Sequence, residues 1–158
     1  MRSTLAIASA EKERRTSDRA LAVTSNNLAS ALLERPDRTE EQTELMMTAA
    51  RAARTFWLKA GDWTHDERSD YLLALVHNAV GEHDAALGHV DKALQTIAAN
   101  GAEPIDAAFL HLARAVALRG LARFEEHAAA VDAAETLARN FTDPGIVEWY
   151  RGELAKAR

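Results

Sequence analysis

Hydrophobic residues recur along the chain three and four positions apart, with polar residues between them. In the segment 84–99, for example, Leu87, Val90, Leu94 and Ile97 follow this spacing. Residues spaced in this way share one face of an α-helix, whereas strands alternate apolar and polar residues at every second position. Since no stretch shows sustained alternation, the sequence predicts an all-α fold without strands.

Residues that typically start or stop helices divide this pattern into seven predicted helices. Thr39–Gln42 and Thr64–Glu67 both fit a capping box, in which two side chains satisfy free backbone N–H groups at a helix start. Ser17-Asp18 suits the start of the first helix, and Gly61 is expected to end the second one in a left-handed conformation. Residues 3–15 either form a separate helix or extend the first one.

The connections between the predicted helices are short, and short connections make neighbouring helices antiparallel. The chain is therefore expected to form one domain, 1–158, built from helical hairpins. Alanine makes up about a fifth of the residues, which favours close approach between helices. The predicted units are hairpins at 17–61, 64–101 and 104–140, followed by a capping helix at 143–157.

Within 67–100, small residues occupy particular positions of one hairpin. Leu73-Ala74 lies in its first helix, Gly81 lies at the turn, and Ala86 and Ala93 lie in its second helix, with Val90 between them. This arrangement resembles a tetratricopeptide repeat. The resemblance implies a right-handed α-α superhelix of about three hairpins, in which Ala74 faces Ala86.

Two further segments resemble the repeat less closely. Residues 106–139 match it if Gly120 takes the place of Gly81 at the turn and two residues are inserted there. The segment Asn26–Ala29 is similar to the first helix of another repeat. Together with the helix at 143–157, these units would form a stack long enough to be stable.

The resemblance implies that the first helix of each hairpin lines a concave groove that binds a peptide or a partner helix. An asparagine amide could hydrogen-bond a peptide backbone, although the asparagines could equally be exposed or bonded within the stack. Arg114 could contact an anion, or could extend from a packed helix into water. The candidate partner-binding residues are Asn26, Asn27, Arg68, Tyr71, Asn78, His111 and Arg114.

Other kinds of site find little support in the sequence. The net charge is −5, and the short basic run Lys12–Arg15 is interleaved with Glu11 and Glu13, as in a solvated helix face, so nucleic-acid binding is not expected. No cysteine is present, and no two histidines have the four-residue spacing that places two metal ligands on one helix face. His65-Asp66-Glu67 is interpreted as an acidic first turn of a helix rather than an acid–base group. We expect no metal, no cofactor and no catalysis.

The start of the chain contains no apolar run of the length found in signal peptides or membrane-spanning helices. The sequence therefore predicts a cytoplasmic protein without membrane contact. The first functional hypothesis is a module that binds a protein or peptide in its groove. Alternatives are a self-associating domain, for instance a homodimer anchored by Trp149, and a sensor of a small molecule or signal peptide.

Overall fold

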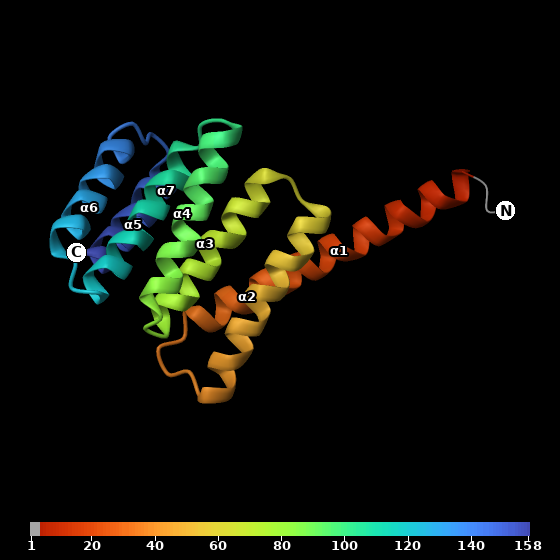
Figure 1. The fold of residues 1–158 in the computed structure, drawn as a ribbon, viewed down its shortest axis with the longest axis horizontal. Helices are drawn as coiled ribbons and strands as arrows, with labels where there is room; N and C mark the ends of the chain where they lie inside the picture. The colour runs from red at the N-terminus through yellow and green to blue at the C-terminus, as the bar shows by residue number, and fades with distance from the viewer. Residues whose placement is uncertain (1–3) are drawn as a thin grey trace.

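The computed structural model describes residues 4–158, and every regular element in that range is an α-helix (Figure 1). The helices are α1 (Thr4–Leu33), α2 (Glu40–Ala60), α3 (Trp63–Ala79), α4 (His83–Asn100), α5 (Pro104–Gly120), α6 (Phe124–Ala138) and α7 (Pro144–Ala157). The all-α prediction is confirmed.

The helices pack in sequential order as antiparallel hairpins. The pairs α1–α2, α3–α4 and α5–α6 each form a hairpin, and α7 packs mainly against α5. Figure 1 shows these helices side by side in one row, with the N-terminal part of α1 projecting beyond it. The predicted arrangement of three hairpins and one terminal helix therefore matches the observed order.

The first helix is one continuous element, so residues 4–15 extend it rather than form a helix of their own. The expected start at Ser17-Asp18 is wrong. The hydroxyl of Ser17 donates to the carbonyl of Glu13 at 3.1 Å, a bond typical of a helix interior. Residue 3 lies outside the described residues.

Alanines form much of the contact between α1 and α2. Ala22 and Ala29 are fully buried, whereas Leu21 and Leu28 are 48% and 39% exposed. Small side chains allow two helix backbones to approach closely, and the larger leucines then remain on the outer face. Of the leucines at helical spacing in this helix, Leu21 and Leu28 therefore face outwards, whereas Leu32 is buried with Ala29 and Met46.

The predicted capping box at Thr39 is confirmed. Its side chain accepts from the backbone of Gln42, and the Gln42 side chain accepts from the backbone of Thr39. The second box lies two residues earlier than expected, because Asp62 and His65 form it instead of Thr64 and Glu67. Gly61 is extended, with φ −98° and ψ −173°, so the expected left-handed stop is wrong.

The turns inside the hairpins α3–α4 and α5–α6 are alike. Gly81 has φ +80° and Ala122 has φ +56°, and both turns carry the same pair of backbone hydrogen bonds. Ala122, not Gly120, therefore occupies the turn position of Gly81. The expected alignment of these two hairpins is wrong by two residues, and this shift changes which residues of α5 are equivalent to those of α3.

The small residues that carry the resemblance lie in the core. Ala74, Ala86 and Ala93 are fully buried in one cluster that also holds Val90 and residues of α5. Close packing of this kind leaves one face of α3 and α5 free to line a surface. That surface is the candidate site.

Candidate functional site

A groove of about 1130 Å³ runs along one side of the helix row. Its lining comes from α1, α3, α5 and α7 and from the connections that follow α1 and precede α5. Among the described residues, none of the lining belongs to α2, α4 or α6. The first helices of the hairpins and the terminal helix therefore form the groove together, and their partner helices cover the opposite side.

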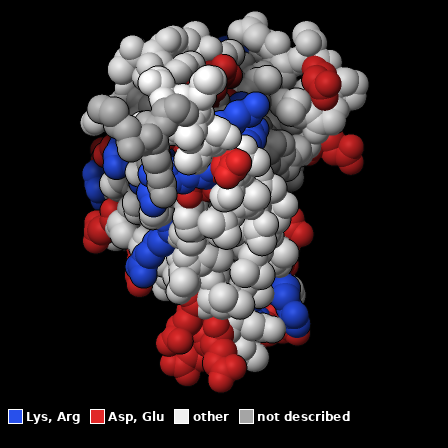
Figure 2. Space-filling view, turned by 90° about the vertical axis from the view of Figure 1, so that its right-hand side faces the viewer, with Lys and Arg blue, Asp and Glu red and all other residues white. Residues whose placement is uncertain are grey.

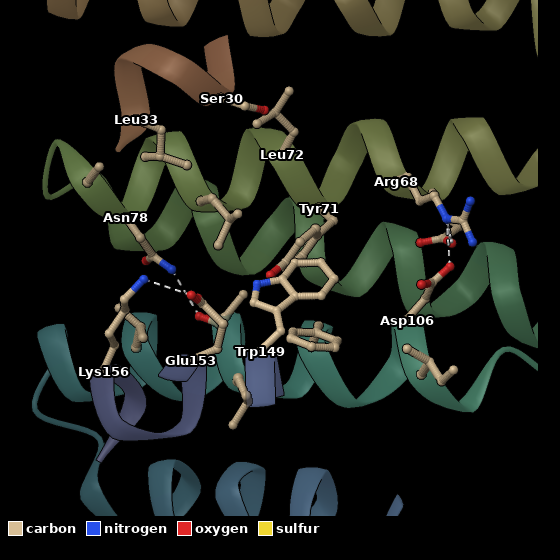
Figure 3. Close-up of a pocket in the computed structure, with 18 of the residues that line it drawn as sticks. Ser30, Leu33, Arg68, Tyr71, Leu72, Asn78, Asp106, Trp149, Glu153 and Lys156 are labelled. Atoms are coloured by element: carbon tan, nitrogen blue, oxygen red, sulfur yellow. Dashed lines mark hydrogen bonds and ion pairs between the residues drawn. The ribbon is translucent and has the colours of Figure 1, made fainter. Parts of the chain in front are cut away.

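The middle of the groove is apolar and aromatic. Its floor is formed by Leu72 of α3 and by Phe109 and Leu112 of α5, which are almost completely buried. The ring of Trp149 of α7 packs against that of Phe109, with centroids 4.2 Å apart and ring planes tilted by 32°, yet it remains 52% exposed. Tyr71 of α3 also lines the groove, and Figure 3 shows both side chains in it. An exposed tryptophan in such a position offers a large apolar contact surface to a ligand.

One end of the groove carries an acidic pair with one arginine. The Nε of Arg68 donates to a carboxylate oxygen of Asp106 at 2.8 Å, which links α3 to α5 (Figure 3). Glu67, the residue before Arg68, is completely buried and also lines the groove. Burial away from water raises the pKa of Glu67 to about 9, and the neighbouring carboxyl of Asp106 acts in the same direction.

The other end of the groove is polar and of mixed charge. There the ammonium of Lys156 lies 2.7 Å from a carboxylate oxygen of Glu153 (Figure 3). The guanidinium of Arg119 donates to the backbone carbonyl of Lys156 at 2.9 Å, which holds the end of α7 against α5. Tyr71 lies between the two ends. Its burial, together with the charges of Glu153 and Asp106, raises the pKa of its hydroxyl.

Four of the seven predicted partner-binding residues line the groove: Asn26, Arg68, Tyr71 and Asn78. The other three, Asn27, His111 and Arg114, do not. Asn27 is exposed on α1 away from the lining. Arg114 pairs instead with Asp91 of α4 at 3.3 Å.

His111 lies one helical turn before Arg114 on α5 and, like it, outside the groove lining. Its burial, with the charge of Arg114, lowers the pKa of the imidazole. The register shift explains both placements. Because Ala122 is equivalent to Gly81, the groove positions of α3 recur on α5 two residues later than the sequence alignment placed them. The equivalent groove-lining pairs are Arg68 and Phe109, Tyr71 and Leu112, Leu72 and Ala113, Leu75 and Val116, and Asn78 and Arg119.

Asn78 lines the groove, but its amide is already used within the stack. Its nitrogen donates to the carbonyl of Ala113 on α5 at 2.9 Å, and its oxygen lies 3.0 Å from the Nδ1 of His83 on α4. This side chain thus connects three helices. A ligand would have to replace these bonds to use the amide.

Sequence reasoning missed Glu67, Asp106 and Trp149 as groove residues. Glu67 was interpreted as part of an acidic first turn, but the shifted capping box places it two residues further into α3. Within that predicted first turn, His65 instead completes the cap, and Asp66 pairs with Arg54 at 3.2 Å. The signal that could have identified Glu67 is its place in the sequence directly before Arg68 and three residues before buried Asp70.

Comparison of the chain with protein-family models, with curated proteins and with solved structures finds no match. Within residues 4–158, no helix is both long and apolar enough to span a membrane. The functional argument therefore depends on the groove itself.

Proposed function

We propose that the chain is a non-catalytic interaction module that binds a peptide or a helix of a partner protein in the groove. The observation that carries this proposal is the apolar middle of the groove, where Trp149 packs against Phe109 and is yet 52% exposed. Tryptophan is enriched among the residues that contribute most to binding at protein interfaces. A groove of about 1130 Å³ also slightly exceeds the usual range of small-molecule pockets.

The proposal includes a tetratricopeptide-like arrangement with a right-handed superhelical path. The buried alanines of the hairpin α3–α4 and the similar turns at Gly81 and Ala122 support it. In such stacks the first helices face the ligand, and here α1, α3 and α5 line the groove.

The test is a selection of peptides from a random displayed library on the wild-type chain. Selected peptides are then measured on two variants that each remove one exposed aromatic side chain. Trp149→Ala removes it from the groove, and Phe124→Ala removes it from α6, where Phe124 is 64% exposed. We expect Trp149→Ala to weaken binding about tenfold or more, as is usual for a central interface tryptophan, and Phe124→Ala to leave it unchanged. Equal affinity for all three proteins would reject the groove as the binding surface.

Self-association is the second candidate function, and one observation favours it. The outer face of the first hairpin exposes large apolar side chains, among them Leu21, Leu45 and Leu58, which are 48%, 45% and 58% exposed. The end units of helical stacks usually carry a polar outer face, because they have no further neighbour. Light scattering over a range of concentrations tests this candidate, and a monomer at every concentration would remove it.

A further inference from the structure

The outer face of α1 carries a heptad pattern that the fold leaves exposed. Two positions of the heptad, three residues apart, define this heptad face. The first positions are Ile7, Arg14, Leu21 and Leu28, and the second positions are Ala10, Ser17, Thr24 and Ala31. All eight residues are exposed, and the apolar Ile7, Leu21 and Leu28 are 48%, 48% and 39% exposed. This spacing follows one side of a helix, and it is the spacing with which two helices pair in a coiled coil.

The heptad face lies on a different side of α1 from the groove. Asn26 and Ser30 line the groove from this helix. On an ideal helix, Leu21 and Leu28 are turned by about 140–180° from these two residues. Figure 1 also shows the N-terminal part of α1 projecting beyond the row of helices, so that half of the heptad face is clear of the rest of the fold. A partner could therefore occupy this face while the groove stays open.

The heptad face is complementary to itself in one orientation. Its first positions carry larger side chains than its second positions. A parallel pair of copies would bring equivalent residues together, and Arg14 would then face Arg14. An antiparallel pair instead brings first positions opposite second positions. If the pair is centred between residues 15 and 16, Leu21 faces Ala10 of the second copy, and Arg14 faces Ser17 with Asp18 beside it. Both size and charge then match.

We propose that α1 pairs with α1 of a second copy, in antiparallel orientation, through the heptad face. This inference deepens the second candidate function, self-association, and does not depend on the groove. The pair has two-fold symmetry, so each contact occurs twice. The projecting segment of each copy lies along the outer side of α1 of the other.

The size of the interface indicates a weak dimer. Residues 7–24 overlap in this register, and a helix segment of that length is about 27 Å long. Such a strip is smaller than the interfaces of permanent dimers, which bury about 1,000 Å² or more from each partner. We therefore expect the dimer to dissociate at micromolar protein concentrations, where unfolding is usually measured, and to form as the concentration approaches millimolar.

Sedimentation equilibrium from micromolar to millimolar concentration tests the interface on three proteins: the wild type, Leu21→Glu and Val23→Glu. Val23 is the matched control, because it is 41% exposed on the same helix but lies outside the heptad face. Both residues are exposed in the monomer, so neither change should disturb its fold. Leu21→Glu places a charge in the apolar contact and should weaken the dimer about tenfold or more. Val23→Glu should leave it unchanged.

The outcomes separate this inference from self-association in general. A wild-type chain that stays monomeric over the whole range would overturn both. A dimer that Leu21→Glu does not weaken, or that both variants weaken equally, would overturn the interface on α1 alone. The proposed role of the groove is unaffected by either result.

Spin-label distances test the antiparallel orientation. The chain has no cysteine, so one label can be attached at Thr16→Cys or at Asn27→Cys, which lie on the same side of α1 and are both exposed. In the antiparallel pair, the two labels of a dimer are separated along the helix axis by about 2 Å at residue 16 and by about 35 Å at residue 27. A parallel pair gives the same short distance at both positions, and that result would overturn the inference.

Discussion

Ala122 is the one described non-glycine residue with a left-handed backbone conformation, with φ +56°. A Cβ atom makes this conformation unfavourable by about 1 kcal/mol, and glycine avoids that cost. The equivalent turn between α3 and α4 has Gly81 at this position. The second hairpin turn is therefore less favourable than the first because of a single methyl group.

Replacement of Ala122 by glycine should stabilise the protein by about 0.5–1 kcal/mol, because it removes the strain of the left-handed conformation. The control is Ala128→Gly, an exposed position inside α6, where glycine should cost about 1 kcal/mol. Urea unfolding of both variants measures the two effects. A destabilising effect of similar size at both positions would contradict this description of the turn.

Glu67 should make the stability of the protein depend on pH. Its pKa is about 9 in the folded state, against an ordinary value of 4.5, so between these values the folded state retains a proton that the unfolded state has lost. The stabilisation is present in full below about pH 4.5 and decreases as the pH rises towards 9. Glu67→Gln has no proton to lose and should gain stability relative to the wild type between pH 6 and pH 8.5. A constant difference between the two unfolding free energies over this range would contradict the raised pKa.

At the scale of the helices, a buried ionic chain connects α2, α3 and α4. Asp70 of α3 is fully buried, and its carboxylate lies 2.6 Å from Arg54 of α2 and 2.9 Å from His89 of α4. Removing one partner of a buried ion pair leaves an uncompensated charge, whereas an exposed pair contributes little. This chain of ion pairs should therefore help to hold the three helices together.

Arg54→Met should destabilise the protein by about 3 kcal/mol, because it leaves the Asp70 carboxylate buried without its arginine. Addition of Asp70→Asn to this variant should recover part of the loss, which a double-mutant cycle measures by urea unfolding. Arg114→Met is the control, since its pair with Asp91 is exposed, and it should change stability by less than about 0.5 kcal/mol. Additive effects of the Arg54 and Asp70 changes would show that the pair is not coupled.

The N-terminal half of α1 has few packing contacts in this chain. Residues 4–17 are all exposed, and the first buried residue of the helix is Ala22. Isolated helices of this length are marginal in water, because most helix stability in proteins comes from packing. We interpret this segment as a part of the helix that adds little to the stability of the domain.

A variant that lacks residues 1–15 should therefore unfold at nearly the same urea concentration as the whole chain. The backbone amides of residues 4–15 should also exchange with solvent much faster than those near Ala29, as hydrogen exchange would show. Further shortening to residue 25 removes Ala22 and the contact of Arg19 with the Trp57 ring, and it should destabilise the protein. A large loss of stability from the shorter deletion would contradict this interpretation, because it would show that the projecting segment contributes to the stability of the domain.

Caps and stops made most helix boundaries predictable from sequence, because each depends on a few neighbouring residues. Thr39, Pro104 and Asp143 all act as expected at their helix starts. The continuous helix through Ser17 was not predictable in this way, because a serine can cap a helix or lie inside one. Asp62, rather than Thr64, caps the start of α3. This one difference accounts for the wrong predictions at both Gly61 and Thr64.

The groove was predictable only as far as the alignment between hairpins was right. On α3 the expected residues Arg68, Tyr71 and Asn78 line it, whereas on α5 a shift of two residues turned His111 and Arg114 away from it. The shift arose because Gly120 looks like a turn residue, although the turn conformation belongs to Ala122. Trp149 lies in the groove because α7 packs across α5, a long-range arrangement that local sequence patterns do not encode.

The face of the molecule seen in Figure 2 carries charges of both signs. Acidic side chains gather at the lower tip of this face. Basic and acidic side chains are interspersed over the rest of this face. The groove differs from such a surface because it combines an exposed tryptophan, an apolar middle and a buried carboxyl group. We therefore regard it as the surface on which function depends.

The most direct test of this account is fluorine NMR of the chain labelled with fluorotryptophan. The three tryptophans serve as probe and controls, because Trp149 lies in the groove, while Trp57 and Trp63 lie outside its lining. A bound peptide obtained by selection should shift the signal of Trp149 and leave those of Trp57 and Trp63 in place. A peptide that binds the protein but leaves the Trp149 signal unchanged would contradict the proposed role of the groove.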